Sequence, residues 1–330
     1  MKKAMHLSGD PAQVMTDAGQ LSSALTAKNR PLTLRIANRL FGEKSFAFEQ
    51  DYLERTQAAF GAPLEAVDFV KAAEPARVKI NGWVEKQTEK LIKDLIPPGA
   101  LNADTRLVLV NAIYFLADWE TPFNKASTSP RPFHARGTQT KNVPTMELTL
   151  GIRHAEVPGA AIAELPYKGG DSSMLVVLPK DKNGLAKLEA LLDAAKLDAW
   201  IGKLESKRVH VVLPKLEIKP PKSIELAKPL SELGMSVAFD RAKADFTGIA
   251  NPPRPQDRLF ISSVVHKAFV RVDEKGTEAA AATAVTMSAA TSMPAPPLDF
   301  VVARPFLFFI RDHASGIVLF IGRVTDPSQR

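Results

Sequence analysis

The chain of 330 residues contains no cysteine. This absence excludes disulfide bonds, thiolate nucleophiles and cysteine-based zinc sites. It leaves the redox compartment open, because disulfides are the feature that would mark an oxidising one. The sequence also lacks an apolar run long enough to span a bilayer, and its basic start, MKKAMHLSGD, lacks the apolar core of a signal peptide. We therefore expect no membrane span in this sequence.

Motifs that carry catalytic or cofactor chemistry are also absent. The sequence contains no G-x-S-x-G elbow, no H-E-x-x-H pair, no P-loop and no G-x-G-x-x-G turn. The histidines lack the spacing of metal ligands; they are His6, His134, His154, His210, His266 and His313. His266 lies in an apolar strand pattern, where a hydrogen-bonded core histidine is favoured over a catalytic or ligand role. We therefore expect no enzyme, no metal site and no cofactor.

The charge is moderately positive, with a formal net charge of +7. The cations are scattered rather than clustered: Lys86, Lys90 and Lys93 alternate with Glu85 and Glu89. This spacing is typical of a solvated helix face, and an anionic partner is the weaker interpretation. We expect no nucleic-acid partner.

The apolar patterns predict an α+β chain, with helices mostly in the first third and strands mostly in the last. Helices are predicted over residues 50–61, 79–99, 184–204 and 223–235. Strands are predicted over residues 32–41, 105–119, 208–218 and 258–274, in a hairpin over 161–181 that turns at 168–171, and in a C-terminal hairpin over 304–327. The strand over 105–119 is so apolar that we expect it to be buried on both faces.

Residues 276–297 read GTEAAAATAVTMSAATSMPAPP and allow three interpretations. The composition suggests a linker, and the run of alanines favours a helix. Alternation instead allows a strand, with a small and increasingly apolar face formed by Thr277, Ala279, Ala281, Thr283, Val285 and Met287. Glycine at the start of the segment permits a backbone turn, and the three prolines near its end disfavour sheet pairing or a helix beyond them.

Several segments, taken together, carry a family resemblance. The segment VVHKAFVRVDEKGTEAAAATAV resembles the strand and hinge of serpins, the serine protease inhibitor family. In the same order as in that family, LVNAIYFLADWETPF, INGWVEKQTEKLI, LPYKGGDSSMLVVLP, LGMSVAFDRAKADFTGI and RPFLFFIRDHASGIVLFIGRVTDP are similar to further serpin segments. The resemblance extends from about Met5 to Pro327. It identifies the chain as a serpin of the bacterial type with a shortened start.

The resemblance implies the α+β serpin fold. This fold has a large, mainly antiparallel central sheet with further sheets and surrounding helices, and it exposes a reactive-centre loop, here at about 274–297. All of residues 1–330 would form one serpin domain. The missing first helices would leave apolar surface uncovered beneath the strand at 108–115. A signal peptide could lie in that missing part, which would favour an extracellular or periplasmic location.

The resemblance also implies a suicide-substrate inhibitor of serine proteases. In serpins the target protease cleaves the loop and forms an acyl-enzyme ester, and the cut loop then inserts into the central sheet and carries the protease with it. The native fold must therefore be metastable. Here the receiving position would lie between the strand of Asn111 and the strand of His266. The alternative is a non-inhibitory serpin-like binding protein or a truncated, defective serpin.

The resemblance assigns the roles of known serpin positions to single residues of this chain. The hinge comprises Glu274, Gly276, Thr277, Glu278, Ala279, Ala280, Ala281 and Ala282, where small residues permit fast insertion. The usual loop length places the reactive bond at Ala290–Thr291, which favours elastase-like or subtilisin-like serine proteases as partners. Met287 and Met293 are alternatives that would suit chymotrypsin-like ones. We expect the inhibitor to be a monomer.

Three more positions match serpin features. Asn111 and His266 match the polar pair that pins the central sheet where it must open, and breaking their bond is part of the cost of opening. Trp119 matches the aromatic residue at the entry point of the loop. A large core anchor is an equally good interpretation of Trp119.

Overall fold

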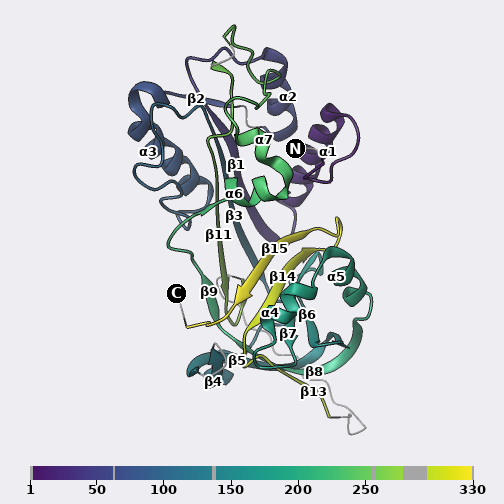
Figure 1. Cartoon of the computed structure of the whole chain (residues 1–330). Coiled ribbons are helices and arrows are strands. Elements are labelled where there is room, and N and C mark those ends of the chain that lie inside the picture. The colour runs from purple at the N-terminus through teal and green to yellow at the C-terminus, as the bar shows by residue number, and fades with distance from the viewer. Residues whose placement is uncertain (1–2, 62–63, 136–138, 255–256, 278–295, 329–330) are drawn as a thin grey trace. The chain divides into compact units, whose positions relative to one another are not determined.

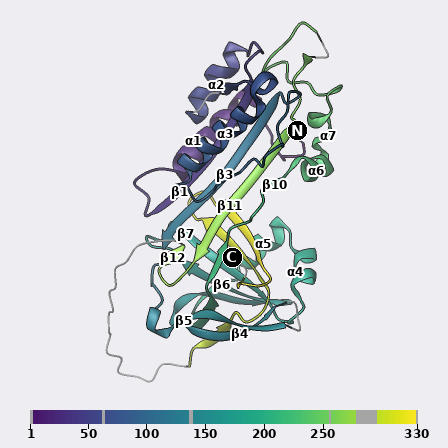
Figure 2. The ribbon, with the colours of Figure 1, turned by 90° about the vertical axis from the view of Figure 1, so that its left-hand side faces the viewer.

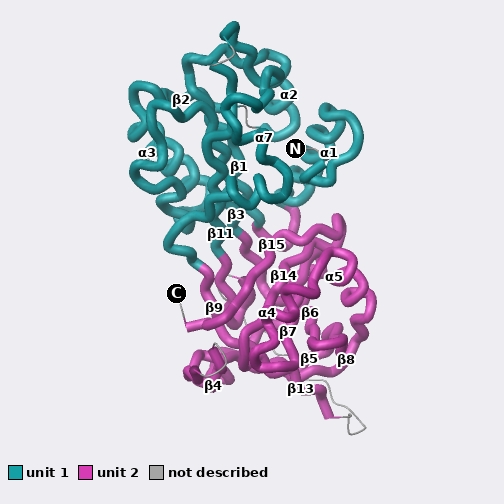
Figure 3. Tube along the Cα trace, in the orientation of Figure 1, with its two compact units in different colours: residues 1–28, 34–114, 219–269 teal, residues 29–33, 115–218, 270–330 magenta. Residues whose placement is uncertain are grey.

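The computed structural model describes residues 3–61, 64–135, 139–254, 257–277 and 296–328. The chain divides into two compact units (Figure 3). Unit 1 comprises residues 1–28, 34–114 and 219–269, and unit 2 comprises residues 29–33, 115–218 and 270–330. The single domain expected over 1–330 stays a prediction. In the described part of the chain, no helix combines the length and hydropathy that crossing a membrane requires.

A seven-stranded mixed sheet has the order β10-β11-β3-β1-β2, with β12 paired to β3 and β9 paired to β11 (Figure 2). One of its ladders is parallel and joins β3 to β11, from Val108–Ser263 to Tyr114–Phe269. The strands are β1 (Leu32–Glu43), β2 (Glu65–Val67), β3 (Leu107–Asp118), β9 (Leu216–Ile218), β10 (Ile224–Glu225), β11 (Ser263–Val272) and β12 (Gly276–Thr277). The strands predicted over 32–41 and 105–119 are confirmed, and the strand predicted over 258–274 is shorter, because β11 begins only at Ser263 and ends at Val272.

Strand β3 has one buried and one half-buried face where it pairs with β11. Val108 and Val110 are fully buried, whereas Leu109, Asn111 and Ile113 on the opposite face are half-buried. The prediction that this strand is buried on both faces is therefore wrong for its second face. Only Leu109 on that face packs against the small apolar cluster of unit 1 that contains Ala238. The expectation of uncovered apolar surface along 108–115 stays a prediction.

Some helices of unit 1 begin or end at residues suited to those positions. They are α1 (Pro11–Leu25), α2 (Gln50–Phe60), α3 (Phe69–Gln87), α6 (Ala227–Leu230) and α7 (Ser236–Phe239), with a π-helical turn η2 (Ser231–Met235) between the last two (Figure 1). The carboxylate of Asp10 accepts hydrogen bonds from the first amides of α1. Gly61 ends α2 in the left-handed conformation. The predicted helix over 50–61 is confirmed.

Helix α3 ends at Gln87, although the apolar spacing predicted a helix over residues 79–99. The side chain of Asn81 accepts a hydrogen bond from the backbone N–H of Ile96 and donates one to its carbonyl, both at 2.9 Å. Ile92 and Leu95 are buried beside this contact. The apolar residues after Gln87 therefore fold back against the unit as an irregular segment, because tertiary contacts outweigh their helical spacing.

Unit 2 contains an eight-stranded sheet of order β13-β8-β5-β6-β7-β14-β15, with β4 paired to β5. The strands are β4 (Ser129–Ala135), β5 (Gln139–Val157), β6 (Ala160–Pro166), β7 (Ser172–Pro179), β8 (Glu205–Pro214), β13 (Leu298–Val301), β14 (Phe306–Asp312) and β15 (Val318–Val324). A short 3₁₀ turn, η1 (Lys125–Ser127), precedes β4. The predicted hairpins β6–β7 and β14–β15 are confirmed by their antiparallel pairing.

The helix predicted over 184–204 is divided into α4 (Leu185–Leu191) and α5 (Ala194–Ile201). The break lies at Asp193, whose carboxylate accepts from the amide of Lys196 at 2.7 Å and so starts a new helix. Both helices still bury their apolar face: Leu188 and Trp200 join a core cluster with Phe309 of β14. The chain thus has the α+β class expected from the sequence.

Candidate functional site

Two residues of the predicted hinge, Gly276 and Thr277, form strand β12 of the seven-stranded sheet. Gly276 pairs with Asp118 and Thr277 with Ala117, both antiparallel to β3. The approach is so close that a Cβ atom on Gly276 would lie 2.0 Å from the carbonyl oxygen of Ala117. Glycine is therefore required at this position by space alone. The other predicted loop residues, Glu278, Ala279, Ala280, Ala281, Ala282, Met287, Ala290, Thr291 and Met293, lie outside the described residues.

Thr277 is held by a buried tyrosine that the sequence analysis missed. The hydroxyls of Tyr167 and Thr277 are 2.7 Å apart, and both residues are fully buried. Burial raises the pKa of Tyr167 well above its usual value, although its hydrogen bond with Thr277 opposes the shift. The phenol therefore stays protonated, and one hydroxyl donates to the other in a buried site.

Trp119 stacks on Tyr167 and also fixes the residues before the hinge. The two rings are 4.7 Å apart and lie within 4° of parallel. The indole N–H of Trp119 donates to the carbonyl of Asp273 at 3.0 Å, and its backbone N–H donates to the carbonyl of Lys275 at 2.6 Å. Trp119 is thus both a core anchor and a contact of the hinge, so the two interpretations of its role are compatible.

Glu274 is a buried residue whose carboxylate contacts two side chains and whose backbone carbonyl accepts one further hydrogen bond. The ammonium of Lys215 lies 2.8 and 3.0 Å from its two oxygens, and the hydroxyl of Thr128 donates to it at 2.8 Å. The backbone N–H of Phe123 donates to its carbonyl at 2.7 Å. Burial by itself would raise the pKa of Glu274, but Lys215 and Thr128 outweigh it and hold the pKa below its usual value. The carboxylate is therefore ionised and paired.

Glu274→Gln is expected to reduce the dependence of stability on acid pH. A carboxyl whose pKa is depressed by folding contributes stability above its unfolded pKa, near 4.3, and this contribution is lost as the pH falls through the folded value. Between about pH 7 and about pH 3, the melting temperature of the wild type should therefore fall about 2–4 °C more than that of the variant. Thermal unfolding followed by circular dichroism measures this difference.

Glu205→Gln is the matched control, because the side chain of Glu205 is 73% exposed and forms an ion pair with the exposed Lys207. Its pH dependence should equal that of the wild type, since exposed pairs contribute little to stability. Equal acid profiles of Glu274→Gln and the wild type would show that the Glu274 contacts do not stabilise the fold.

The predicted polar pair is present in unit 1. The Nδ1–H of His266 donates to Oδ1 of Asn111 at 2.7 Å, and the two residues are direct partners in the β3–β11 ladder. Burial lowers the pKa of His266, so the neutral ring is favoured. The ladder is closed on both sides of this pair, and any strand entering between β3 and β11 would have to break it.

The resemblance named the hinge, Trp119 and the Asn111–His266 pair, and their roles stay predictions. The side chains that contact Glu274 and Thr277 were not predicted. Lys215, Thr128 and Tyr167 carry no motif of their own in the sequence. A weak signal exists for Lys215, which interrupts an apolar strand pattern directly after Pro214. In the described residues, no group of three or more histidine and acidic side chains could hold a metal ion.

Comparisons with known proteins indicate the family to which the chain belongs. The family model described as "Serpin (serine protease inhibitor)" matches residues 1–327. Human serpin B10 is 39% identical over 319 residues, which cover 96% of this chain and 78% of that protein. Leukocyte elastase inhibitor A of Rattus norvegicus is 41% identical over 315 residues, which cover 93% of this chain and 81% of the relative.

A solved structure is similar over nearly the whole chain. Serpin48 of the insect Tenebrio molitor matches with a TM-score of 0.86 and 34% identity, covering 98% of this chain and 84% of its own. The fold expected from the sequence is thereby confirmed, and the family is one of inhibitors rather than catalysts. The bacterial type stays a prediction. The match of the family model and of these relatives leads to one conclusion: the chain belongs to the serpin family.

Proposed function

We propose that this chain inhibits serine proteases as a suicide substrate, with Gly276 and Thr277 as the start of the strand that inserts after cleavage. The observation that carries this proposal is the pairing of both residues with β3. The buried hydroxyl of Thr277 also lies on the face that alternation assigned to the interior. The hinge is therefore already bonded at the place from which insertion would proceed.

The direction of the strands supports insertion beside β3. Strand β12 runs antiparallel to β3, and β3 runs parallel to β11. A strand that continued β12 between them would be antiparallel to both. It would replace one parallel ladder by two antiparallel ones, which are slightly more stable per residue. The additional hydrogen bonds and the better pairing geometry would lower the free energy of the inserted state below that of the uncleaved, metastable state.

The register of β12 gives the inserted strand a specific position. Each residue further along β12 pairs with one residue earlier in β3, as the pairs Gly276–Asp118 and Thr277–Ala117 show. The same register would place Thr283 opposite Asn111. Insertion would then separate Asn111 from His266 and offer the threonine hydroxyl as a replacement partner. The role of this pair in opening the sheet is part of the proposal.

The target class follows from the loop sequence and the relatives. We place the reactive bond at Ala290–Thr291, and a small residue before the cut suits the shallow primary pocket of an elastase-like or subtilisin-like protease. The relative named leukocyte elastase inhibitor A supports the same class. Cleavage after Met287 or Met293 would instead suit a chymotrypsin-like protease. A monomeric state and an extracellular setting stay predictions.

The proposal is tested by mixing the purified protein with elastase, subtilisin and chymotrypsin and separating the products on denaturing gels. We expect a complex with elastase or subtilisin that survives denaturation, because an ester joins the two chains. Mass spectrometry of the released C-terminal fragment should give Thr291 as its first residue.

Absence of a covalent complex with every serine protease tested would contradict inhibition. Cleavage without a complex, together with an unchanged melting temperature of the cleaved protein, would support the alternative of a non-inhibitory binding protein. A large rise in melting temperature after cleavage, in contrast, would show that the loop inserts even where the protease escapes.

A further inference from the structure

One histidine of unit 2 is buried with a ring nitrogen that has no partner. His154 of β5 is 4% exposed, and its Nδ1 has no hydrogen-bond partner among the described residues. A hydrogen on Nδ1 would therefore be removed from water without an acceptor, which is costly in a buried site. The neutral ring with its hydrogen on Nε2 lowers this cost, because only a lone pair then remains at Nδ1.

The ring of His154 packs against strand β13. Its centroid lies 5.8 Å from that of Phe300, with the two ring planes at 80°, and Phe300 is itself buried. Strand β13 follows residues 276–297 directly and pairs in parallel with β8. The neighbouring Asp299 of β13 contacts His210 of β8 instead, at 2.9 Å. His154 thus lies beside the strand that attaches the C-terminal end of the predicted loop to the sheet.

The acidic side chains nearest to His154 each pair with a lysine. Oε1 of Glu156 lies 3.9 Å from Nε2 of His154, but Glu156 is exposed and its other oxygen lies 2.8 Å from the ammonium of Lys180. Glu205, the direct partner of His154 in the β5–β8 ladder, pairs with Lys207 at 3.2 Å. Neither acid is therefore a dedicated counter-ion for a charged imidazole.

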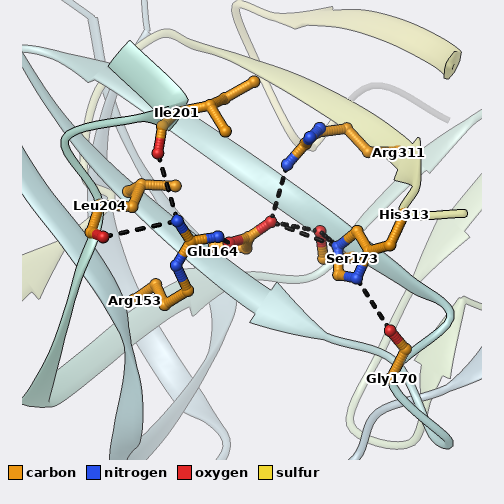
Figure 4. Close-up of polar contacts among 8 residues, drawn as sticks. All are labelled: Arg153, Glu164, Gly170, Ser173, Ile201, Leu204, Arg311 and His313. Atoms are coloured by element: carbon orange, nitrogen blue, oxygen red, sulfur yellow. Dashed lines mark hydrogen bonds and ion pairs between the residues drawn. The ribbon is translucent and has the colours of Figure 1, made fainter. Parts of the chain in front are cut away.

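The buried carboxylate of Glu164 lies on the opposite face of the sheet. It accepts a hydrogen bond from Nη1 of Arg153 at 2.7 Å, and the two residues are direct partners in the β5–β6 ladder (Figure 4). Because successive side chains of a strand point to opposite faces, Arg153 and Glu164 face away from His154. This carboxylate therefore offers no acceptor to the histidine ring.

Burial lowers the pKa of His154 below its usual value; Glu156 opposes this shift and Lys207 adds to it. A histidine whose pKa falls on folding contributes its full stability above the unfolded pKa, about 6.5. The contribution is lost as the pH falls from there towards the folded value. A local opening that exposes the ring therefore becomes more frequent in weak acid.

We propose that His154 makes the attachment of strand β13 sensitive to weak acid. A second proton on the ring needs an acceptor at Nδ1, so it is taken up more readily when Phe300 moves away and water reaches the ring. In weakly acidic solution β13 then detaches locally more often, and the C-terminal end of the predicted loop is held less firmly. This response belongs to unit 2 and is independent of the proposed inhibition.

The proposal is tested by hydrogen exchange of the whole protein, followed by nuclear magnetic resonance at about pH 7.5 and about pH 5.5. The reporter is the amide of Val302, which donates to the carbonyl of Val212 at 2.9 Å. Its protection, corrected for the intrinsic exchange rate, should fall up to about tenfold in acid, because the lower pH is about one unit below the unfolded histidine pKa. The amides of β14 should keep their protection, and an equal fall there would overturn a local effect at β13.

His154→Phe removes the titrating group and keeps an aromatic ring against Phe300. Its Val302 amide should be protected equally at the two pH values. His210→Gln is the matched control, because it changes the other histidine that contacts β13, and it should retain the fall seen in the wild type.

The ring of His154 supplies an independent readout in the wild type. Its ¹⁵N shifts at about pH 6 should be those of a neutral imidazole, although an unperturbed histidine is mostly charged there. A charged ring at this pH would overturn the proposal, and so would an equal loss of Val302 protection in His154→Phe and the wild type. The ring measurement decides the question even if the variant folds poorly.

Discussion

Thr277→Arg should convert the protein from an inhibitor into a substrate that elastase or subtilisin cleaves without being trapped. The threonine is fully buried and its hydroxyl is 2.7 Å from that of Tyr167, so an arginine there would have to bury an unpaired cation or leave the sheet. An uncompensated buried charge costs about 3–5 kcal/mol, which corresponds to at least about a hundredfold loss of trapping relative to release. Denaturing gels and the ratio of inhibitor consumed per protease inhibited measure this change.

Thr277→Ser is the matched control, because it keeps the hydroxyl that contacts Tyr167 and removes only a methyl group. It should inhibit nearly as well as the wild type. Unchanged inhibition by Thr277→Arg would contradict insertion that starts at β12. Loss of inhibition in both variants would indicate that the methyl group, rather than the absence of charge, is what the site requires.

Trp119→Ala should lower the free energy of unfolding by about 3–5 kcal/mol, as expected when a buried tryptophan is truncated. It should also release the hinge, because the indole stacks on Tyr167 and donates to the carbonyl of Asp273. The expected result is a lower melting temperature together with faster exchange of the backbone amides at Thr277 and Lys275. Thermal unfolding and hydrogen exchange measure the two effects separately.

Trp200→Ala separates a general loss of core packing from an effect on the hinge. Trp200 is 5% exposed and belongs to the core cluster of unit 2 with Leu188 and Phe309. Among the described residues, this cluster contains none of residues 273–277. It should lose a similar amount of stability while the exchange of the hinge amides stays as in the wild type. If Trp119→Ala and Trp200→Ala affect the hinge equally, Trp119 acts only as a core anchor.

The family resemblance named the hinge because its residues are nearly consecutive and their small size is visible in the sequence, and the role of the hinge stays a prediction. The partners of the hinge could not be found in this way. Lys215 lies 59 positions from Glu274, Thr128 lies 146 positions from it, and Tyr167 lies 110 positions from Thr277. Only the folded chain brings these side chains together, and no local pattern in the sequence pairs them with the hinge.

Two helix predictions, over residues 79–99 and 184–204, were wrong in their bounds for a related reason. Apolar residues continue at helical spacing beyond Gln87, but Asn81 binds the backbone of Ile96 and the chain turns back. Within residues 184–204, the periodic pattern continues through Asp193, yet the carboxylate of that residue caps a second helix. Periodicity reports which residues become buried more reliably than it reports where the backbone changes direction.

Strand β12 also has a kinetic consequence. An inserting strand must normally search for its register, and the first bonded pair carries most of the entropy cost of closing the loop. Here Gly276 and Thr277 already occupy that first register against Asp118 and Ala117. In the proposed mechanism, insertion therefore extends a strand pairing that already exists, and no new pairing has to be nucleated. Insertion competes with hydrolysis of the acyl-enzyme ester. Because two residues are already paired, the rate of insertion should rise relative to the rate of hydrolysis.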